Sequence, residues 1–387
     1  MSFFQLASDP PTKLGIYRVL SSRAGVRVSP LVLGAMSVGD KWDAHGMGSM
    51  NKESSFKLLD AYFDMGGNFI DTANNYQDET SEEFIGEWAE KRGIRDQLVI
   101  ATKGLTPSLH STQQTSSVEM TLLRKRSTTS GTTPSLCSVE ASLKKLRTSY
   151  VDILYVHWWD YETSIPEVMD SLHNLVATQK VLYLGVSDTP AWVVSQANQY
   201  AVDHGKTPFV VYQGKWSILD RSFEREIIPM ARSLGMALSP WGVLGQGKLR
   251  TDAEEERRKE TGEKGRSVWS PNWERTEVEV KVCWALEKVA AEVGVGSNIT
   301  AVAIAYVMHK TPYVFPIIRG RKVEHLEANL KALDISLTKE HIEYLESTIP
   351  FDPGFPTTMI GDGSAYHILL ASAAKMAKQL GLQPIKH

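Results

Sequence analysis

Short apolar runs rich in β-branched residues recur along the chain and alternate with segments of helical periodicity. There are eight such runs: Leu31–Leu33, Asn68–Asp71, Leu98–Thr102, Val151–His157, Leu182–Val186, Phe209–Tyr212, Met236–Ser239 and Val314–Ile318. Near-continuous apolar runs of this length are typical of parallel strands that helices cover on their outer face. The pattern therefore predicts an α/β protein built from eight strand–helix units.

The segments between the runs carry helix signals. Phe56, Leu59 and Phe63 form one apolar stripe, and Thr80 with Glu83 forms a capping-box pattern that predicts a helix start at Thr80. An open sheet that binds a dinucleotide should show G-x-G-x-x-G after its first strand, and the sequence has no such motif. The pattern thus favours a closed (β/α)8 TIM barrel with its chemistry in the loops after the strands.

The chain is expected to form one domain over residues 1–387, with the barrel at about 28–350 and a tail at 351–387. Two stretches lack an apolar period, Gly104–Pro134 and Gly245–Pro271, and both are predicted to be long loops on the catalytic face. The tail is predicted to contain a helix over Tyr366–Leu380.

Composition narrows the classes of function. The 387 residues carry a net charge of -3, which gives no reason to expect nucleic acid or an anionic membrane surface as a partner. Cys137 and Cys283 are too few for a disulfide framework and lack the spacing of metal ligands, so no metal site is expected. These features, without a long apolar stretch, suggest a cytoplasmic protein; oligomeric state stays open.

Four polar residues fall at the ends of three consecutive predicted strands: Asp71, Tyr76, Lys103 and His157. A nearby ammonium lowers the pKa of a phenol, a carboxylate holds that ammonium in place, and a histidine can orient a carbonyl oxygen. Each residue alone is more often a turn, cap or structural residue. Together they suit protonation of an oxyanion as a hydride arrives at the adjacent carbon.

Two further segments indicate phosphate binding. Gly242–Lys248 nearly spells a P-loop, but Leu249 replaces the magnesium-binding Ser or Thr, which disfavours a phosphotransferase. Its glycines still allow close backbone approach, and Lys248 adds charge. After the eighth run, Arg319–Asn329 places basic residues at a helix start, which suits a phosphate monoester or is simply solvated.

The strings Asn68–Tyr76, Ala101–Lys103 and Tyr155–His157 resemble the aldo-keto reductase superfamily. His157–Asp160 and Leu182–Trp192 are more similar to fungal aryl-alcohol dehydrogenases, especially the norsolorinic acid reductase-like members of aflatoxin and sterigmatocystin pathways. The resemblance implies that Asp71, Tyr76, Lys103 and His157 form a catalytic tetrad.

The resemblance also implies an NADP(H) site. Its expected contacts are Asp71, Ser187, Asp188, Gln213, Ser239, Gly242, Val243, Leu244, Gly245, Gln246, Gly247, Lys248, Gly320, Arg321, Lys322, His325 and Asn329. Three positions depart from the family pattern. Asp188 replaces an asparagine, Leu238 an aromatic residue that stacks on the nicotinamide, and Arg319 a glycine.

Trp42, Trp158 and His157 are expected to line the mouth for an aromatic carbonyl, whereas Trp159 is expected to pack in the core. These features predict NADPH-dependent reduction of an aryl aldehyde or aromatic polyketide ketone in fungal secondary metabolism. A second hypothesis is an NADPH-binding regulatory subunit with little turnover. It draws on the departures at Asp188 and Leu238 and on residues 104–136, which look unrelated to the sequences this chain otherwise resembles.

Overall fold

A computed structural model describes residues 6–43, 48–105, 133–262, 273–379 and 381–386. Its main sheet has eight parallel strands in the order β10-β3-β4-β5-β6-β7-β8-β9. Their bounds are β3 Val32–Gly34, β4 Phe69–Asp71, β5 Val99–Leu105, β6 Val151–His157, β7 Val181–Ser187, β8 Phe209–Lys215, β9 Ala237–Trp241 and β10 Ile317–Ile318. Each of the eight predicted runs overlaps one of these strands.

The sheet closes through the segment that leads into β10. The amide of Leu238 in β9 donates to the carbonyl of Tyr313 at 2.9 Å, and the amide of Phe315 donates back to Leu238 at 2.8 Å. Ser239 Oγ adds a bond to the Phe315 carbonyl at 3.1 Å. The first and last strands are therefore joined, and the predicted (β/α)8 barrel is confirmed.

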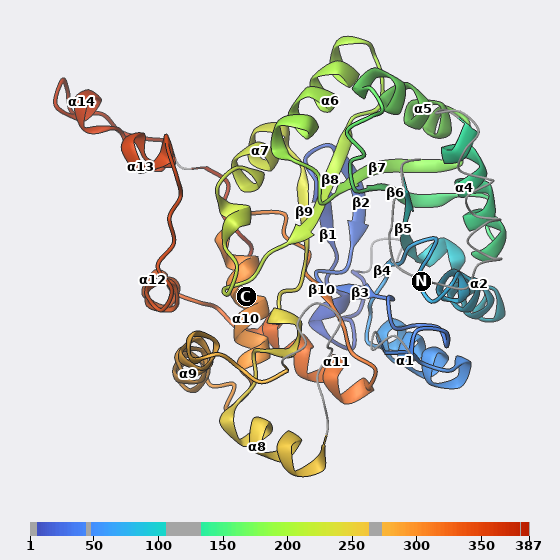
Figure 1. Ribbon diagram of the computed structural model, residues 1–387, viewed down its shortest axis with the longest axis horizontal. Helices are drawn as coiled ribbons and strands as arrows, with labels where there is room; N and C mark the ends of the chain where they lie inside the picture. Colours follow the sequence, from blue (N-terminus) through green and yellow to red (C-terminus); the bar gives the residue numbers. More distant parts are fainter. Residues whose placement is uncertain (1–5, 44–47, 106–132, 263–272, 380, 387) are drawn as a thin grey trace.

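Helices surround the barrel in chain order. In Figure 1, α1, α2, α4, α5, α6 and α7 follow one another around the strands, and α9, α10 and α11 complete the ring. Their bounds are α1 Lys52–Asp64, α2 Thr80–Arg92, α4 Thr133–Lys145, α5 Ile165–Ala177, α6 Ala191–Asp203, α7 Ile227–Leu234, α9 Glu277–Glu292, α10 Ile299–Lys310 and α11 Val323–Leu330; α12, Lys339–Ser347, follows.

Strand alternation divides the apolar core into two parts. One cluster fills the barrel interior and includes Phe69, Ile153 and Phe315. The other lies between the strands and the helices and includes Leu33, Ile70 and Leu154. A hairpin that the sequence did not reveal, β1 Arg18–Ser21 and β2 Ala24–Val28, contributes to the interior cluster beside residues that begin strands, so it closes the amino-terminal end of the barrel.

The charge run at Asp252–Thr261 forms helix α8, and the prediction of a loop there was wrong. This helix lacks an apolar stripe and gains its stability at its ends. Thr251 caps it by accepting from the Glu254 amide, acidic residues occupy its first turn, and Arg258 and Lys259 lie in its last turn, as the helix dipole favours. The other long predicted loop, Gly104–Pro134, lies almost wholly outside the described residues.

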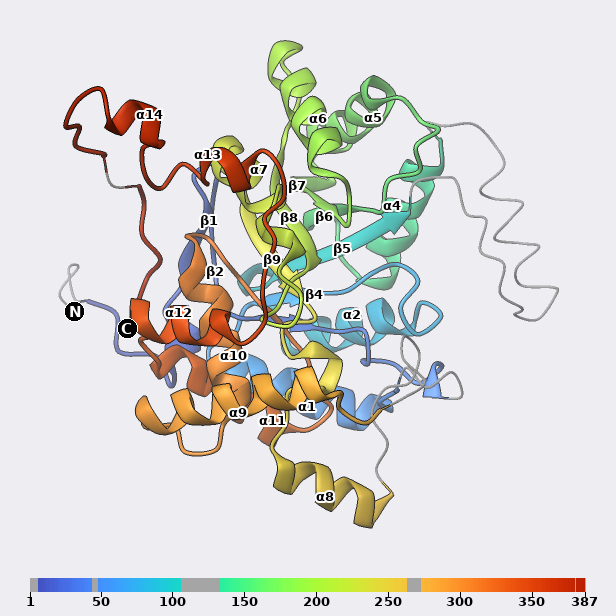
Figure 2. The same cartoon turned by 60° about the vertical axis from the view of Figure 1, so that its left-hand side comes forward.

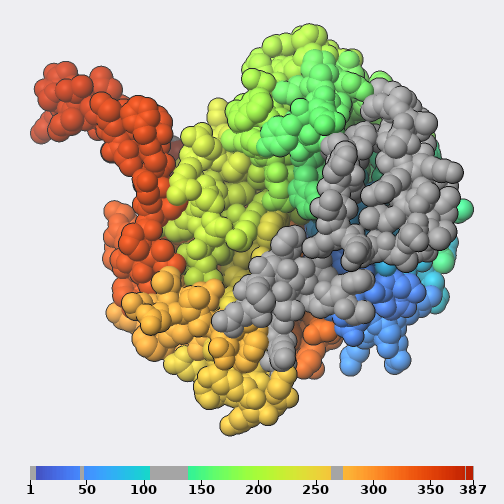
Figure 3. All heavy atoms as spheres, viewed as in Figure 1, coloured from blue at the N-terminus to red at the C-terminus, as the bar shows by residue number. Residues whose placement is uncertain are grey.

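The predicted tail helix over Tyr366–Leu380 is also wrong. The described tail contains only two four-residue helices, α13 Thr357–Ile360 and α14 Ile368–Ala371. Figures 1, 2 and 3 show this segment projecting from the barrel, and Ile368 and Leu369 are exposed. A short helix with no surface to pack against has too few contacts to offset its nucleation cost.

The predicted capping box at Thr80 and Glu83 was wrong as well. The cap residue of α2 is Glu79, which makes no side-chain capping bond, and the Thr80 hydroxyl donates instead to the Gln77 carbonyl at 2.8 Å. No helix in the described part of the chain is long and apolar enough to cross a membrane.

Gly86 allows α2 to approach α4 closely, and its replacement by alanine is expected to destabilise the protein. An added Cβ would lie 2.7 Å from Leu146 Cα, which belongs to the backbone and cannot rotate away. We expect Gly86→Ala to lower the free energy of unfolding by about 1–3 kcal/mol despite alanine's better helix propensity. Urea unfolding measures this change in the free energy of unfolding. Gly25→Ala, where an added Cβ meets nothing within 4 Å, is the control, and equal stability of the two variants would contradict the close approach.

Candidate active site

A buried ion pair lies at the carboxyl end of the barrel. Lys103 Nζ on β5 contacts Asp71 Oδ1 on β4 at 2.6 Å and donates to the Thr72 carbonyl at 2.7 Å. The other carboxylate oxygen, Asp71 Oδ2, accepts from Gln213 Nε2 on β8 at 2.9 Å. The side chains of Lys103 and Asp71 are 0% and 4% exposed, so their charges depend on each other rather than on water.

Tyr76 lies beside this pair. Lys103 Nζ is 5.0 Å from the centre of the Tyr76 ring, and the His157 ring meets Tyr76 edge-on at 6.4 Å. Trp42 also packs edge-on against Tyr76, with ring centres 6.1 Å apart. The structure thus brings together all four residues of the predicted catalytic set, and it places Trp42 against the phenol.

His157 is held in its neutral form. Burial lowers its pKa to about 3, and the positive charge of Lys103 contributes to the shift. Its Nδ1 is buried and has no hydrogen-bond partner among the described residues. Because an unpaired buried N–H is costlier than an unpaired acceptor, the favoured tautomer carries its proton on Nε2. His157 is therefore suited to donate a hydrogen bond without carrying charge.

A second buried ion pair supports the site from outside the barrel. Thr102 and Lys103 are adjacent on β5 and therefore face opposite sides of the sheet. Thr102 Oγ1 donates to Glu82 Oε1 on α2 at 2.6 Å, and Glu82 Oε2 lies 2.7 Å from Lys145 Nζ on α4. Lys145 also donates to the Asn74 carbonyl at 3.0 Å. These contacts join Asn74, four residues before Asp78, to α4 directly and to α2 through Lys145.

Ser187 ends β7 and Asp188 follows it, where the sequence predicts contacts to the nicotinamide. Asp188 Oδ2 accepts from Ser187 Oγ at 3.0 Å, and the Trp241 indole donates to Asp188 Oδ1 at 3.1 Å. Burial raises the pKa of Asp188, although these two hydrogen bonds and one from Trp158 oppose the shift. The carboxylate that replaces the family's asparagine thus has indole donors of its own.

Two strand ends carry unusual backbone angles. Trp158 follows β6 with φ 70° and Asp188 follows β7 with φ 49°. A left-handed conformation is unusual for a residue as large as tryptophan, and such strain is concentrated at functional sites. Leu238 points away from this region, because it is buried in the cluster between strands and helices. Trp241, in contrast, packs on the interior cluster.

The glycine-rich loop after β9 exposes its backbone. Gly242, Gly245 and Gly247 all have positive φ, and a Cβ at Gly247 would meet nothing within 4 Å. The side chain of Val243, in contrast, is buried in the core. Lys248 does not extend from the loop but donates to the Glu274 carbonyl and lies 3.7 Å from Glu279 Oε2. Close backbone approach is therefore available, whereas the charge of Lys248 is already compensated.

The basic segment after β10 lies close to Tyr76, because Arg319 contacts Met36 and Met36 packs with Tyr76. Arg321 and Lys322 are exposed at the start of α11, and Arg321 lies near Gly48. His325 is exposed and Asn329 is buried on the same helix. Arg319 Nη1 reaches Met36 Sδ at 3.2 Å, and its buried Nε has no partner among the described residues. An unpaired buried guanidinium N–H and two exposed cations fit an anionic ligand.

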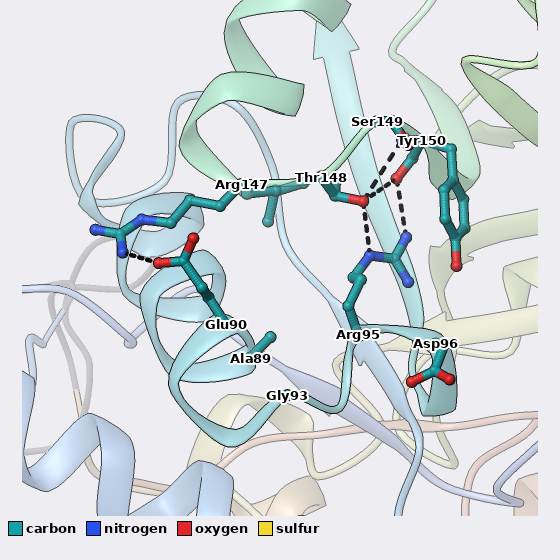
Figure 4. A pocket seen from close by; sticks show the side chains of 10 residues that line it. Ala89, Glu90, Gly93, Arg95, Asp96, Arg147, Thr148, Ser149 and Tyr150 are labelled. Carbon is teal, nitrogen blue, oxygen red and sulfur yellow. Dashed lines mark hydrogen bonds and ion pairs between the residues drawn. The ribbon is translucent and has the colours of Figure 1, made fainter.

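A separate hollow of about 480 Å³ lies beside Arg95 and Tyr150 (Figure 4). These residues precede β5 and β6, so the hollow is at the opposite end of the barrel from Tyr76. Arg95 lines it but donates to the carbonyls of Leu98 and Tyr150 and to Asp152. Its charge is therefore used within the fold.

Within the described ranges, no group of three His, Cys, Asp or Glu residues is placed to hold a metal ion.

Three residues at the site were not predicted from the sequence. Trp241 could have been found, since it lies two residues after Ser239 on one strand and so shares its face. Tyr155 lies in the barrel interior with Lys103 Nζ 5.8 Å from its ring centre. Gln77 is buried directly after Tyr76, but nothing in the sequence distinguishes it from an exposed loop residue.

Replacement of His157 should change the pH dependence of stability. An unfolded histidine titrates near pH 6.5, whereas folded His157 titrates at about 3. The stability that comes from keeping His157 neutral is therefore complete above pH 6.5 and is lost as pH falls toward 3. Between pH 7 and 4.5, the wild type should lose about 2–3 kcal/mol more unfolding free energy than His157→Gln. Denaturant titrations test this, with exposed His204→Gln as control; parallel curves for wild type and His157→Gln would contradict it.

Comparison with known proteins places this arrangement in a family. Residues 30–350 match the aldo/keto reductase family. The chain is 58% identical over 388 residues, covering 100% of this chain and 99% of the relative, to an aryl-alcohol dehydrogenase [NADP(+)] of Phanerodontia chrysosporium. It is 51% identical to the aldo-keto reductase ausK of Emericella nidulans, covering 97% and 93% of the two chains. It is 49% identical to norsolorinic acid reductase B of Dothistroma septosporum, covering 89% and 84%. This protein belongs to the aldo/keto reductase family.

Proposed function

We propose that this protein is an NADPH-dependent reductase of aromatic carbonyl compounds, either aryl aldehydes or aromatic polyketide ketones of fungal secondary metabolism. The observation that carries the proposal is the contact of Tyr76 with the buried Asp71–Lys103 pair and with neutral His157. Relatives named aryl-alcohol dehydrogenase and norsolorinic acid reductase support the substrate class.

Tyr76 is the proton donor in this proposal. Its hydroxyl protonates the carbonyl oxygen, and the ammonium of Lys103 stabilises the phenolate that remains. Asp71 keeps Lys103 in position, and Gln213 holds the free oxygen of Asp71. His157, with a proton on Nε2, donates a hydrogen bond that orients the carbonyl oxygen and stabilises the developing negative charge.

The residues present fit NADP(H), which supplies the hydride when bound. The backbone around Gly245 and Gly247 can approach the pyrophosphate. The nicotinamide would be held by residues at or near the carboxyl ends of three strands, namely Ser187, Asp188, Gln213 and Ser239. The exposed cations at the start of α11, joined by the unpaired Nε of Arg319, favour a cofactor with an additional phosphate over NADH.

Tyr76→Phe should abolish reduction without preventing cofactor binding. Loss of the acid should lower kcat for an aryl aldehyde by about 100- to 10,000-fold. Stopped-flow single-turnover oxidation of NADPH measures the chemical step, and quenching of protein fluorescence measures NADPH binding. Tyr344→Phe, on α12, is the control.

A variant with wild-type single-turnover rates would contradict the role of Tyr76. If the wild type itself bound NADPH but transferred no hydride to any aromatic aldehyde or ketone, the binding-only hypothesis would replace this proposal.

Arg321→Ala should weaken NADPH binding selectively. If this guanidinium contacts the additional phosphate, the Kd for NADPH should rise about 10- to 100-fold. The Kd for NADH should change little, because NADH lacks that group. Lys339→Ala, at the exposed start of α12, controls for loss of a surface cation. Equal weakening for both cofactors would contradict this position for the phosphate.

A further inference from the structure

Three successive residues after Tyr76 adopt the left-handed conformation: Gln77 with φ 53°, Asp78 with φ 48° and Glu79 with φ 78°. None of them is glycine. This conformation costs about 1–2 kcal/mol per residue, and it persists only where surrounding contacts over-determine it. The contacts of these three residues should therefore show what the strained turn is for.

The side chain of Gln77 is 0% exposed, and its amide is fully used. Nε2 donates to the carbonyls of Met36 and Gly48, both at 2.9 Å. Oε1 accepts from the amides of Lys41 at 3.0 Å and Trp42 at 2.9 Å. Two donors and two acceptor positions are thus matched to four backbone groups. All four belong to the connection between β3 and α1, whereas Gln77 belongs to the connection between β4 and α2.

The next strained residue holds the same tryptophan. Asp78 Oδ1 accepts from Trp42 Nε1 at 2.9 Å, so Gln77 fixes the backbone of Trp42 and Asp78 fixes its ring. Gly39 allows this fit, because a Cβ at that position would lie 2.5 Å from Gln77 Cβ. The turn therefore directs two consecutive side chains onto Trp42, whose ring packs edge-on against Tyr76.

We propose that Gln77 is a positioning residue that sets substrate specificity: its buried amide holds Trp42 at a fixed distance from Tyr76. A flat aromatic substrate that packs against Trp42 then presents its carbonyl oxygen to the Tyr76 hydroxyl. A small aliphatic aldehyde does not span the two rings and gains little from this arrangement. The inference rests on the proposed function, because it assumes that Tyr76 is the proton donor.

The kinetic test compares two substrates at saturating NADPH. Gln77→Leu removes all four hydrogen bonds at similar volume. It should lower kcat/KM for 2-naphthaldehyde by about 100-fold, as a displacement of about 1 Å at a reacting group can do. For butanal the loss should stay within a few-fold. Equal losses for the two aldehydes, or unchanged selectivity, would overturn the proposal, because a residue that only supports the fold has no reason to distinguish them.

Gln77→Gly keeps the test decisive if the leucine variant does not fold. Glycine accepts positive φ without cost, so this variant relieves the backbone strain while it deletes the amide. It should lose selectivity as Gln77→Leu does. Wild-type selectivity in Gln77→Gly would show that the amide is not required, and would overturn the proposal.

A second measurement needs no activity. Trypsin cleaves the bond between Lys41 and Trp42. Gln77 Oε1 accepts from the Trp42 amide, which belongs to that bond, and from the amide of Lys41, one bond earlier. Cleavage after Lys41, followed by mass spectrometry of the intact protein, should be at least about 10-fold faster in Gln77→Leu and Gln77→Gly than in the wild type, since local opening exposes the bond. Gln199→Leu, on α6, is the matched control because that amide bonds Asp203.

Wild-type cleavage rates in both Gln77 variants would overturn the positioning role. The two measurements also separate this inference from the proposed function. A wild type without reductase activity but with cleavage controlled by Gln77 would refute the function and leave the contact in place, whereas an active wild type with unchanged selectivity in the variants would refute only the role of Gln77.

Discussion

The buried pair of Asp71 and Lys103 is the interaction on which the site depends. Two charges without access to water are costly unless each satisfies the other, and removal of one partner leaves the second uncompensated. The barrel supplies the remaining contacts, with the Thr72 carbonyl for the ammonium and Gln213 for the carboxylate. The charge held there also contributes to the low pKa of His157. The pair thus joins three strands, and the charge of Lys103 adds to the effect of burial on His157 in a fourth.

The fold could be predicted from the sequence to the extent that it depends on periodic burial. All eight barrel strands were found, because parallel strands buried on both faces leave continuous apolar runs. The hairpin β1–β2 was missed because its alternation is short, and α8 was missed because capping and charge, rather than an apolar stripe, stabilise it. For the tail, the sequence predicted a helix that the structure lacks, because the helix-forming residues there have no surface to pack on.

The residues of the candidate site likewise differ in whether the sequence reveals them. Asp71, Lys103 and His157 could be found because a strand end is visible in the sequence and the barrel brings such ends together. For Lys248, the sequence shows a cation beside glycines but not the contact with Glu279 that the fold adds. Gln77 could not be found at all, because its partners are backbone groups of residues 29 to 41 positions earlier in the chain, and backbone groups have no signature in sequence.

Around Tyr76, the strands and the loops hold different groups. The strands fix the groups that set charge, namely Asp71, Lys103 and His157, and their positions depend on the barrel register. The loops fix Trp42, the proposed substrate contact, through Gln77 and Asp78. Under the proposed function, a change in the loop contacts would therefore alter which carbonyl compound reaches Tyr76 without disturbing the ion pair of Asp71 and Lys103. The strained turn after Tyr76 is where the two systems meet, because one end of it carries Tyr76, the proposed proton donor, and the other begins helix α2.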